Sequence, residues 1–383
     1  MSSMQATVHD SIQEIPAREW NALAGRHYPF LRYEFLCAAE VGGCVSAEAG
    51  WTPRHITISD GGTLRAAMPL YEKAHSWGEF VFDWAWASAY HRAGVPYYPK
   101  LVSAAPFTPV TSRRLLLADA DDRDAAMALI RSAIAHSKDT GCSSLHILFP
   151  LEEELSMFRD AGLRIRKDCQ FHWHNRNYTD FDEFLQTFNA VKRKKVKRDR
   201  RHVTEAGIRF RRLHGKDIDD DMWQFVYRMI SITFMRRGSL PYFDLDFFRR
   251  IGEQLPESIL VILAEQQDDP VAAAVFFESD RALYGRYWGS SVDYNALHFE
   301  TCYYQGIEYC IDTGKSVFEP GTQGEHKISR GFVPVPAWSA HWLAEPKFFS
   351  AIGEYLDQET RHVEHYMRAV NTHSPYRKPR DQS

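Results

Sequence analysis

Two stretches of the chain share a pattern of apolar and polar positions about 205 residues apart. In the first, apolar runs at 56–58 and 64–70 flank an acidic, glycine-rich turn; in the second, runs at 261–263 and 271–275 flank a turn with two aspartates and a proline. Each pattern predicts a β-hairpin, and an aromatic-rich segment follows both. Because the spacing is too long for a solenoid repeat, we expect the duplication of a whole domain.

Helical and extended periodicities alternate through the remaining chain. The predicted helices are 121–138, 151–160, 221–236, 245–254, 298–311 and 346–367; the predicted strands include 144–149, 170–174, 283–288 and 316–319. This order indicates an α/β fold with mixed sheets flanked by helices. A length of 383 residues suits two domains. We place them at 1–177 and 178–383, the first as the acceptor-binding half and the second as the catalytic half.

Composition narrows the class of protein. No run approaches the roughly 18 apolar residues that cross a bilayer, and the N-terminus has no signal-peptide pattern. The six cysteines have neither the spacing of a zinc site nor that of a disulfide framework. We therefore expect a cytoplasmic protein with reduced thiols and no metal.

A concentrated basic segment stands out against a net charge of −4. Residues 192–201 include eight Lys or Arg and one Asp, within a helical pattern that begins at Asp180 with a capping box to Glu183. The segment is either a solvated helix end or a site for an anionic partner such as RNA phosphates or a lipid surface. The candidate nucleic-acid contacts are Lys192, Arg193, Lys194, Lys197, Arg198 and Arg201.

Two irregular loops of the first half are rich in proline and aromatic residues, at 97–100 and 106–109. Lys100 and Arg113 have the charges to clamp a phosphate or carboxylate, unless they only extend over a rigid surface loop. In the second half, 319–332 is the densest polar segment and follows a predicted strand end, where α/β sheets place ligands. It is either a site or a flexible loop with chance charges. His172 and His174 fit an ordinary polar strand face better than a metal site.

Seven strings of residues resemble the FemAB-like family of predicted N-acyltransferases, in order along 30–359. They are 82–86, 97–101, 106–109, 170–173, 284–289, 298–300 and 324–327. The resemblance implies a tandem duplication of the acetyltransferase (GNAT-like) fold with a cleft between the two domains. Relatives of the Fem type transfer an amino acid from aminoacyl-tRNA to an amine of a peptidoglycan precursor. These relatives have a lysine in a Phe-Lys-x-Gly-Phe-like motif, and Lys327 is similar to it. The present sequence departs from the motif in two ways: His326 replaces the first Phe, and two extra residues stand between Lys327 and Gly331.

The donor stays open between two classes. Acetyltransferases that use coenzyme A cradle its pyrophosphate with an Arg/Gln-x-x-Gly-x-Gly/Ala turn before a helix, and neither half contains a good match. This absence and the basic segment favour aminoacyl-tRNA over acyl-CoA as co-substrate. We expect no tightly bound cofactor. The oligomeric state is not indicated.

The expected reaction is direct acyl or aminoacyl transfer to a small-molecule or peptide amine. Lys327 would stabilise the oxyanion, and Glu325, His298 or Glu300 would remove the amine proton. The candidate substrate-binding residues are Asp83, Tyr98, Lys100, Arg113, Arg286, Trp288, Tyr304, Gln323, His326 and Arg330. The alternative class is a non-catalytic protein that binds RNA or a cell-wall fragment.

Overall fold

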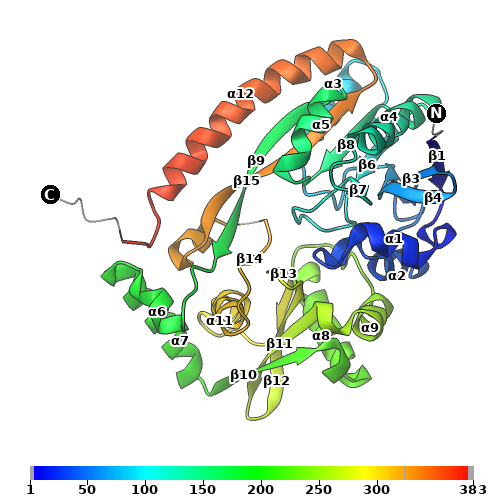
Figure 1. Cartoon of the computed structure of the whole chain (residues 1–383). Helices are drawn as coiled ribbons and strands as arrows, with labels where there is room; N and C mark the ends of the chain where they lie inside the picture. Colours follow the sequence, from blue (N-terminus) through cyan, green and yellow to red (C-terminus); the bar gives the residue numbers. More distant parts are fainter. Residues whose placement is uncertain (1–3, 323, 378–383) are drawn as a thin grey trace. The chain divides into compact units, whose positions relative to one another are not determined.

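A computed structural model describes residues 4–322 and 324–377. The chain forms two compact units (Figure 1): unit 1 comprises Met1–Asp168 with Pro336–Glu364, and unit 2 comprises Cys169–Val335 with His365–Ser383. The boundary at Asp168 lies close to the division proposed from the sequence at 177. The sequence interpretation did not predict that residues 336–364 belong to unit 1. The local sequence of a strand and a helix near the C-terminus does not indicate which sheet they pack with.

Unit 1 begins with an antiparallel sheet in the order β1-β3-β4-β7, formed by β1 (Gln5–His9), β3 (His55–Asp60), β4 (Thr63–Met68) and β7 (Leu116–Leu117). Helices α1 (Ala17–Ala24) and α2 (Tyr33–Val41) precede the hairpin. Helix α4 (Arg123–Asp139) covers β3 and β4 and buries Leu129 and Ile130 against Ile56 and Ile58. The side chain of Asp122 caps α4 by accepting from Ala125 N at 3.1 Å.

A second group of strands in unit 1 follows the order β2-β5-β6-β8-β15-β9. Their bounds are β2 (Trp51–Pro53), β5 (Tyr71–Lys73), β6 (Lys100–Ser103), β8 (Ser144–Leu148), β15 (Val333–Leu343) and β9 (Arg164–His174). Strands β6 and β8 are parallel, and β15 runs antiparallel to β8. Helices α3 (Trp84–Arg92), α5 (Leu155–Asp160) and most of α12 (Pro346–Asn371) complete the unit.

Unit 2 contains strands in the order β10-β11-β12-β13-β14-β9. They are β10 (Ile208–His214), β11 (Ile259–Gln266), β12 (Asp269–Glu278), β13 (Ala282–Ser290), β14 (Val317–Glu319) and the end of β9. Helices α8 (Asp220–Met235) and α9 (Leu245–Gln254) lie between β10 and β11 in the chain, and α8 packs on β12 and β13 (Figure 1). A Cβ on Gly289 would lie 1.7 Å from the Met229 carbonyl oxygen, so only glycine allows this approach.

The two units repeat one order of elements. Each has a strand, two helices, an antiparallel hairpin and a third strand, and each adds a parallel strand after a further helix: β8 in unit 1 and β14 in unit 2. Both predicted hairpins are present, as β3–β4 and β11–β12. The predicted α/β class with a duplicated, acetyltransferase-like arrangement is confirmed.

The predicted single helix from Asp180 is wrong, because the structure divides it in two. Helix α6 (Phe181–Gln186) ends before Phe188, whose side chain is fully buried, and α7 (Ala190–Glu205) begins with a new cap. The Asn189 side chain accepts from Lys192 N at 3.0 Å. An asparagine cap of this kind starts a helix rather than continuing one, so the basic residues lie on a helix of their own. Within the described residues, we find no helix with the length and apolar character needed to cross a membrane.

Candidate functional site

A helical segment of unit 2 runs through Leu297–Phe299 (α10), a π-helical turn at Glu300–Tyr304 and Gln305–Asp312 (α11). A π-turn adds a residue to one turn and rotates the side chains that follow, and such turns are frequent at functional sites. Thr301 Oγ1 donates to the Leu297 carbonyl at 2.9 Å inside this turn. The segment therefore presents Phe299 toward one side and buries Tyr303 and Tyr304.

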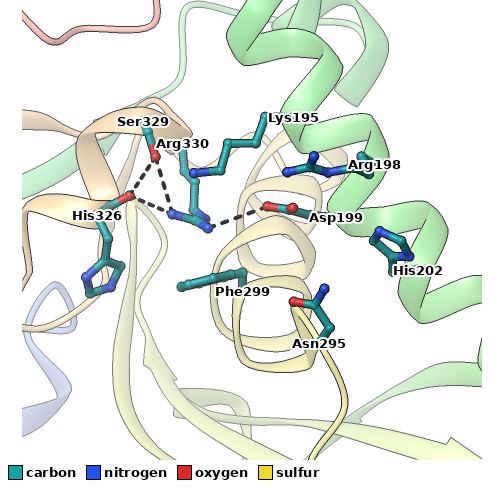
Figure 2. A pocket seen from close by; sticks show the side chains of 9 residues that line it. All are labelled: Lys195, Arg198, Asp199, His202, Asn295, Phe299, His326, Ser329 and Arg330. Atoms are coloured by element: carbon teal, nitrogen blue, oxygen red, sulfur yellow. Dashed lines mark hydrogen bonds and ion pairs between the residues drawn. The ribbon is translucent and has the colours of Figure 1, made fainter.

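Beside this turn lies a pocket of about 550 Å³, drawn in Figure 2. Its side chains come from unit 2: from α7, from the start of the π-containing helix and the loop before it, and from the 3₁₀ helix η7 (Glu325–Arg330). The lining residues are Lys195, Arg198, Asp199, His202, Asn295, Phe299, His326, Ser329 and Arg330.

The pocket lining carries a surplus of positive charge. Lys195, Arg198 and Arg330 face a single carboxylate, Asp199, which already accepts from Tyr304 Oη at 3.0 Å and lies 3.5 Å from Arg330. The Arg330 side chain is 3% exposed, and its Nε has no hydrogen-bond partner among the described atoms. Its guanidinium lies 3.4 Å from the centre of the Phe299 ring. A pocket of this charge favours an anionic ligand.

Lys327 lies on η7, between two pocket residues, and only 1% of its surface is exposed. Its Nζ donates to the carbonyl of Gly321. Burial lowers the pKa of the Lys327 amine to about 7, because the charged form loses its hydration. The loop before η7 depends on glycine: Gly324 has φ of 105°, and the His326 ring occupies the place of a Cβ.

Two histidines lie close to Lys327. Burial, with the charges of His326 and Arg330 nearby, lowers the pKa of His298 to about 4, so its ring is neutral at pH 7. His326 Nε2 lies 2.9 Å from Tyr303 Oη, and burial lowers the pKa of this histidine as well. The His298 ring also packs against Trp288, with 5.5 Å between ring centres.

The two predicted carboxylate bases have other partners. Glu300 is buried and pairs with Arg200 at 3.2 Å; burial raises its pKa, and Arg200 opposes that rise. Glu325 is exposed and accepts from Tyr366 Oη at 3.0 Å.

Three further residues of unit 2 were predicted to bind substrate. Tyr304 serves as the partner of Asp199 in the pocket wall. Burial lowers the pKa of Arg286, which lies beside Tyr287. Gln323 lies outside the described residues.

Helix α7 places the predicted nucleic-acid contacts on several faces. Lys194, Lys197, Arg198 and Arg201 are exposed, while Lys192 and Arg193 are half-buried. Lys197 pairs with Asp182 at 3.2 Å and Arg201 with Glu205 at 3.6 Å. Arg198 lines the pocket, together with residues that the sequence interpretation did not select: Lys195, Asp199 and His202. Their spacing of three, four and seven residues from Lys195 is that of one helix face, and this signal could have identified them.

The predicted acceptor residues of unit 1 form a closed polar cluster. Lys100 is fully buried; its Nζ donates to Glu79 at 2.8 Å, to Ser76 at 2.8 Å and to Asp83. Asp83 also accepts from Tyr97 Oη at 2.6 Å. Lys100 and Asp83 thus neutralise each other inside the unit instead of lying open to a ligand. Two further predicted residues are more accessible: Tyr98 hydrogen-bonds Ser76 at 2.8 Å, and Arg113 is half-buried.

Solved structures with a similar fold include FemX, at 13% identity over 91% of this chain and 100% of that chain, with a TM-score of 0.56. A C-terminal domain of a putative lysylphosphatidylglycerol synthetase from Agrobacterium fabrum matches at 11% identity over 90% and 97%, with a TM-score of 0.57. The L-PGS structure from Bacillus licheniformis matches at 11% over 87% and 98%, with a TM-score of 0.52. At these identities the likeness shows the fold.

No match was found among functionally curated proteins. A family model, by contrast, matches residues 11–378 and is described as FemAB-like, peptidoglycan biosynthesis/recognition. Because the match spans almost the whole sequence, the chain belongs to the FemAB-like family.

Proposed function

We propose that the protein is an N-acyltransferase that moves an acyl or aminoacyl group onto an amine by direct attack. The observation that carries this proposal is the buried amine of Lys327 on the helix that also supplies His326 and Arg330 to a positively charged pocket. Lys327 has no carboxylate partner among the residues that the structure describes, and burying a lysine in this way costs stability, so its position calls for a chemical role.

In this reaction the acceptor nitrogen attacks the carbonyl carbon of the donor, and a C–N bond forms. The carbonyl oxygen becomes an oxyanion, which the protonated Lys327 stabilises as the negative charge develops. The bond from carbon to the leaving oxygen or sulfur then breaks, and the proton lost by the amine passes to the leaving group. A pKa of about 7 leaves both protonation states of Lys327 populated near neutral pH, and a nearby oxyanion favours the charged one.

Of the three residues predicted as bases, His298 fits best. Its imidazole is neutral at pH 7 and packs against Tyr303 and, at 6.5 Å between ring centres, against His326. Glu300 is held by Arg200, and Glu325 is exposed. The neutral imidazole has a free lone pair for the amine proton, and its low pKa makes it a weak base that passes this proton on to the leaving group.

For the donor we favour aminoacyl-tRNA, because the pocket adjoins the basic helix α7. Lys194, Lys195 and Arg198 are exposed and have no acidic partner among the described residues, so they are available to phosphates. The family description, peptidoglycan biosynthesis/recognition, supports an amine of a cell-wall precursor as acceptor and hence a cytoplasmic reaction. Acyl-CoA is the second candidate, since the same cations suit its phosphates.

A transfer assay separates these candidates. The protein is incubated with a mixture of amine-bearing cell-wall precursors and either charged tRNA or acyl-CoA, and products are identified by mass spectrometry. We expect transfer from charged tRNA that ribonuclease abolishes and that acyl-CoA does not restore. Transfer from acyl-CoA alone would show that acyl-CoA is the donor, while the protein would still be an N-acyltransferase. Binding of RNA or precursor without turnover under either condition would refute the transferase proposal and favour a binding protein.

A further inference from the structure

Arg200 joins helix α7 to the π-containing helix beside the pocket, through two carboxylates at once. Its Nε donates to Glu300 at 3.2 Å, and its Nη2 donates to Glu308 at 3.1 Å. The guanidinium carbon also lies 4.4 Å from the centre of the Phe181 ring. Arg200 itself does not line the pocket, and the proposed reaction does not use it. Its contacts instead connect two elements that do line the pocket.

The two carboxylates share one side of their helix because of the π-turn at Glu300–Tyr304. In an uninterrupted α-helix, residues eight positions apart point about 80° away from each other. A π-turn contains one extra residue, so the path from Glu300 to Glu308 turns as far as about seven steps of an α-helix and ends only about 20° from alignment. The π-turn therefore brings both carboxylates within reach of a single guanidinium.

Glu300, the first residue of the π-turn, is 2% exposed and depends on its partners. Gln305 supplies two further hydrogen bonds. Its backbone N–H donates to the Glu300 carbonyl, the bond between residues five apart that defines a π-turn, and its Nε2 donates to the Glu300 carboxylate at 2.9 Å. A buried carboxylate that loses its cation is strongly destabilised, so removal of Arg200 should drive Glu300 toward solvent and let the turn relax.

The π-turn directly follows Phe299, which lines the pocket (Figure 2). The guanidinium of Arg330 lies over this ring, 3.4 Å from its centre. Asp199, the neighbour of Arg200 on α7, accepts from Tyr304, the last residue of the π-turn, at 3.0 Å. Two adjacent residues of α7 thus hold the two ends of the π-turn, and a rotation of the turn would move Phe299 away from Arg330.

We propose that Arg200 is a positioning residue of the pocket: by binding both carboxylates it stabilises the π-turn, and the π-turn keeps Phe299 in contact with Arg330. The inference deepens the proposed function, on which its kinetic consequence rests. Arg212 provides a matched comparison, since it lies 3.8 Å from Glu308 and donates to Asp312 at 2.6 Å. Within the described residues it has no hydrogen bond or ion pair with the π-turn.

The first test needs no substrate. In the full chain with nitrogen-15-labelled arginine, the Nε–H resonance of Arg330 is assigned by its loss in Arg330→Lys. Its difference from the same resonance in Phe299→Leu measures the ring-current shift that Phe299 causes. We expect Arg200→Gln to lose at least half of this shift, Arg200→Lys to lose less because it can reach one carboxylate, and Arg212→Gln to keep it.

An unchanged shift in a folded Arg200→Gln protein would overturn the proposal and leave Arg200 as a stabilising ion pair alone. Absence of the shift in the wild type would overturn it as well. Glu308→Gln, which removes one of the two partners of Arg200, serves if Arg200→Gln does not fold, and it should lose part of the shift. Retention of the whole shift in Glu308→Gln would then contradict the proposal.

The second test is a double-variant cycle in the transfer assay, with charged tRNA and acyl-CoA as separate donors. Arg200→Gln should raise KM for the donor by about fivefold or more. If Arg200 acts through Arg330, adding Arg200→Gln to Arg330→Lys should raise KM no further. Effects that multiply would show that Arg200 does not act through Arg330. Absence of turnover in the wild type would refute the proposed function, whereas the positioning role would still be decided by the arginine resonance.

Discussion

The guanidinium carbon of Arg330 lies over the Phe299 ring, 3.4 Å from the ring centre. One guanidinium nitrogen donates to the His326 carbonyl at 2.7 Å, while the other lies 3.5 Å from Asp199. The stacked ring, the carbonyl and the carboxylate together fix the guanidinium at the pocket wall, with its Nε still without a partner among the described atoms. Such a group is preorganised for an anionic ligand.

Replacing this guanidinium by an ammonium group should weaken binding of the acyl donor. Arg330→Lys keeps the charge and the pairing with Asp199, but it loses the planar stacking and the Nε donor. We expect KM for the donor to rise at least tenfold, roughly 1.4 kcal/mol, with kcat changed much less. Steady-state kinetics with varied donor concentration measures the effect.

The control for this variant is Arg211→Lys, since Arg211 is on the surface and pairs with Glu265 at 2.8 Å. It should behave as the wild type. An unchanged KM in a folded Arg330→Lys protein would remove the pocket from donor binding.

Charge removal on α7 gives a second prediction, because the helix offers its own control. Lys195→Gln with Arg198→Gln removes two cations that line the pocket, whereas Lys197→Gln with Arg201→Gln removes two that pair with Asp182 and Glu205. If tRNA phosphates contact the pocket face, the first pair should flatten the slope of log affinity against log salt by about 1.5. The second should change it by clearly less. Filter binding of charged tRNA at several salt concentrations makes the comparison.

Equal effects of the two pairs would show that only the total charge of the helix matters. No effect of either pair, with activity on acyl-CoA retained, would leave α7 as a solvated helix and shift the donor to the thioester.

The hairpins could be predicted from the sequence because their signal is local. Apolar runs on both sides of an acidic turn determine strand pairing over about ten residues, and the structure pairs Ile56 with Met68 and Val261 with Val275 accordingly. The break before α7 was also encoded locally, by Asn189, but apolar residues at helical spacing on both sides concealed it. A cap is a single residue, so a longer run of apolar residues at helical spacing outweighs it when helices are predicted from the sequence.

The pairing of Lys100 could not be predicted in the same way. Its partners Glu79 and Asp83 lie 21 and 17 residues earlier, across a loop and a helix, so no periodicity connects them. An isolated lysine in an aromatic loop fits an open ligand clamp as well as a buried ion pair. The pocket was partly accessible to prediction, because Lys195, Arg198 and His202 share a helix face, whereas the approach of Phe299 and Arg330 depends on the tertiary fold.

The buried cluster around Lys100 should make the stability of the protein depend on pH. Burial raises the pKa of Glu79 to about 7 from an ordinary value of 4.5, against the opposing charge of Lys100. Between these values the folded state holds a proton that the unfolded state releases, so this residue lowers the unfolding free energy as pH rises from about 4.5 to 7. Glu79→Gln removes this dependence.

Urea unfolding at pH 5 and pH 8 tests the direction of this pH dependence. From pH 5 to pH 8, the unfolding free energy of Glu79→Gln should rise relative to that of the wild type by on the order of 1–3 kcal/mol. Lys73 has the opposite effect on the unfolding free energy, and at higher pH. Burial lowers its pKa in the folded protein to about 7, so above pH 7 the unfolded state binds a proton that the folded state does not, and the unfolding free energy rises with pH. The exposed Glu153→Gln serves as control and should follow the wild type. Parallel profiles for all three proteins would contradict the raised pKa of Glu79.

The role of Lys327 can be decided by the pH dependence of transfer. Since its pKa is about 7, the ammonium fraction falls as pH rises through neutrality, and an oxyanion stabiliser should lose effectiveness in that range. With an acceptor amine that is neutral throughout, kcat/KM of the wild type should therefore decline above pH 7. Lys327→Arg, which stays charged, should abolish this decline even if its overall rate is lower. Lys327→Met should reduce turnover by about 10²-fold or more below pH 7, and by less above pH 7, where the wild-type amine has also lost its charge. A rate that instead rises through pH 7, with the rise lost in Lys327→Arg, would mean that the neutral amine acts as the base. Near-normal turnover of a folded Lys327→Met protein would exclude the residue from the reaction, leaving the pocket cations and His298 to account for catalysis.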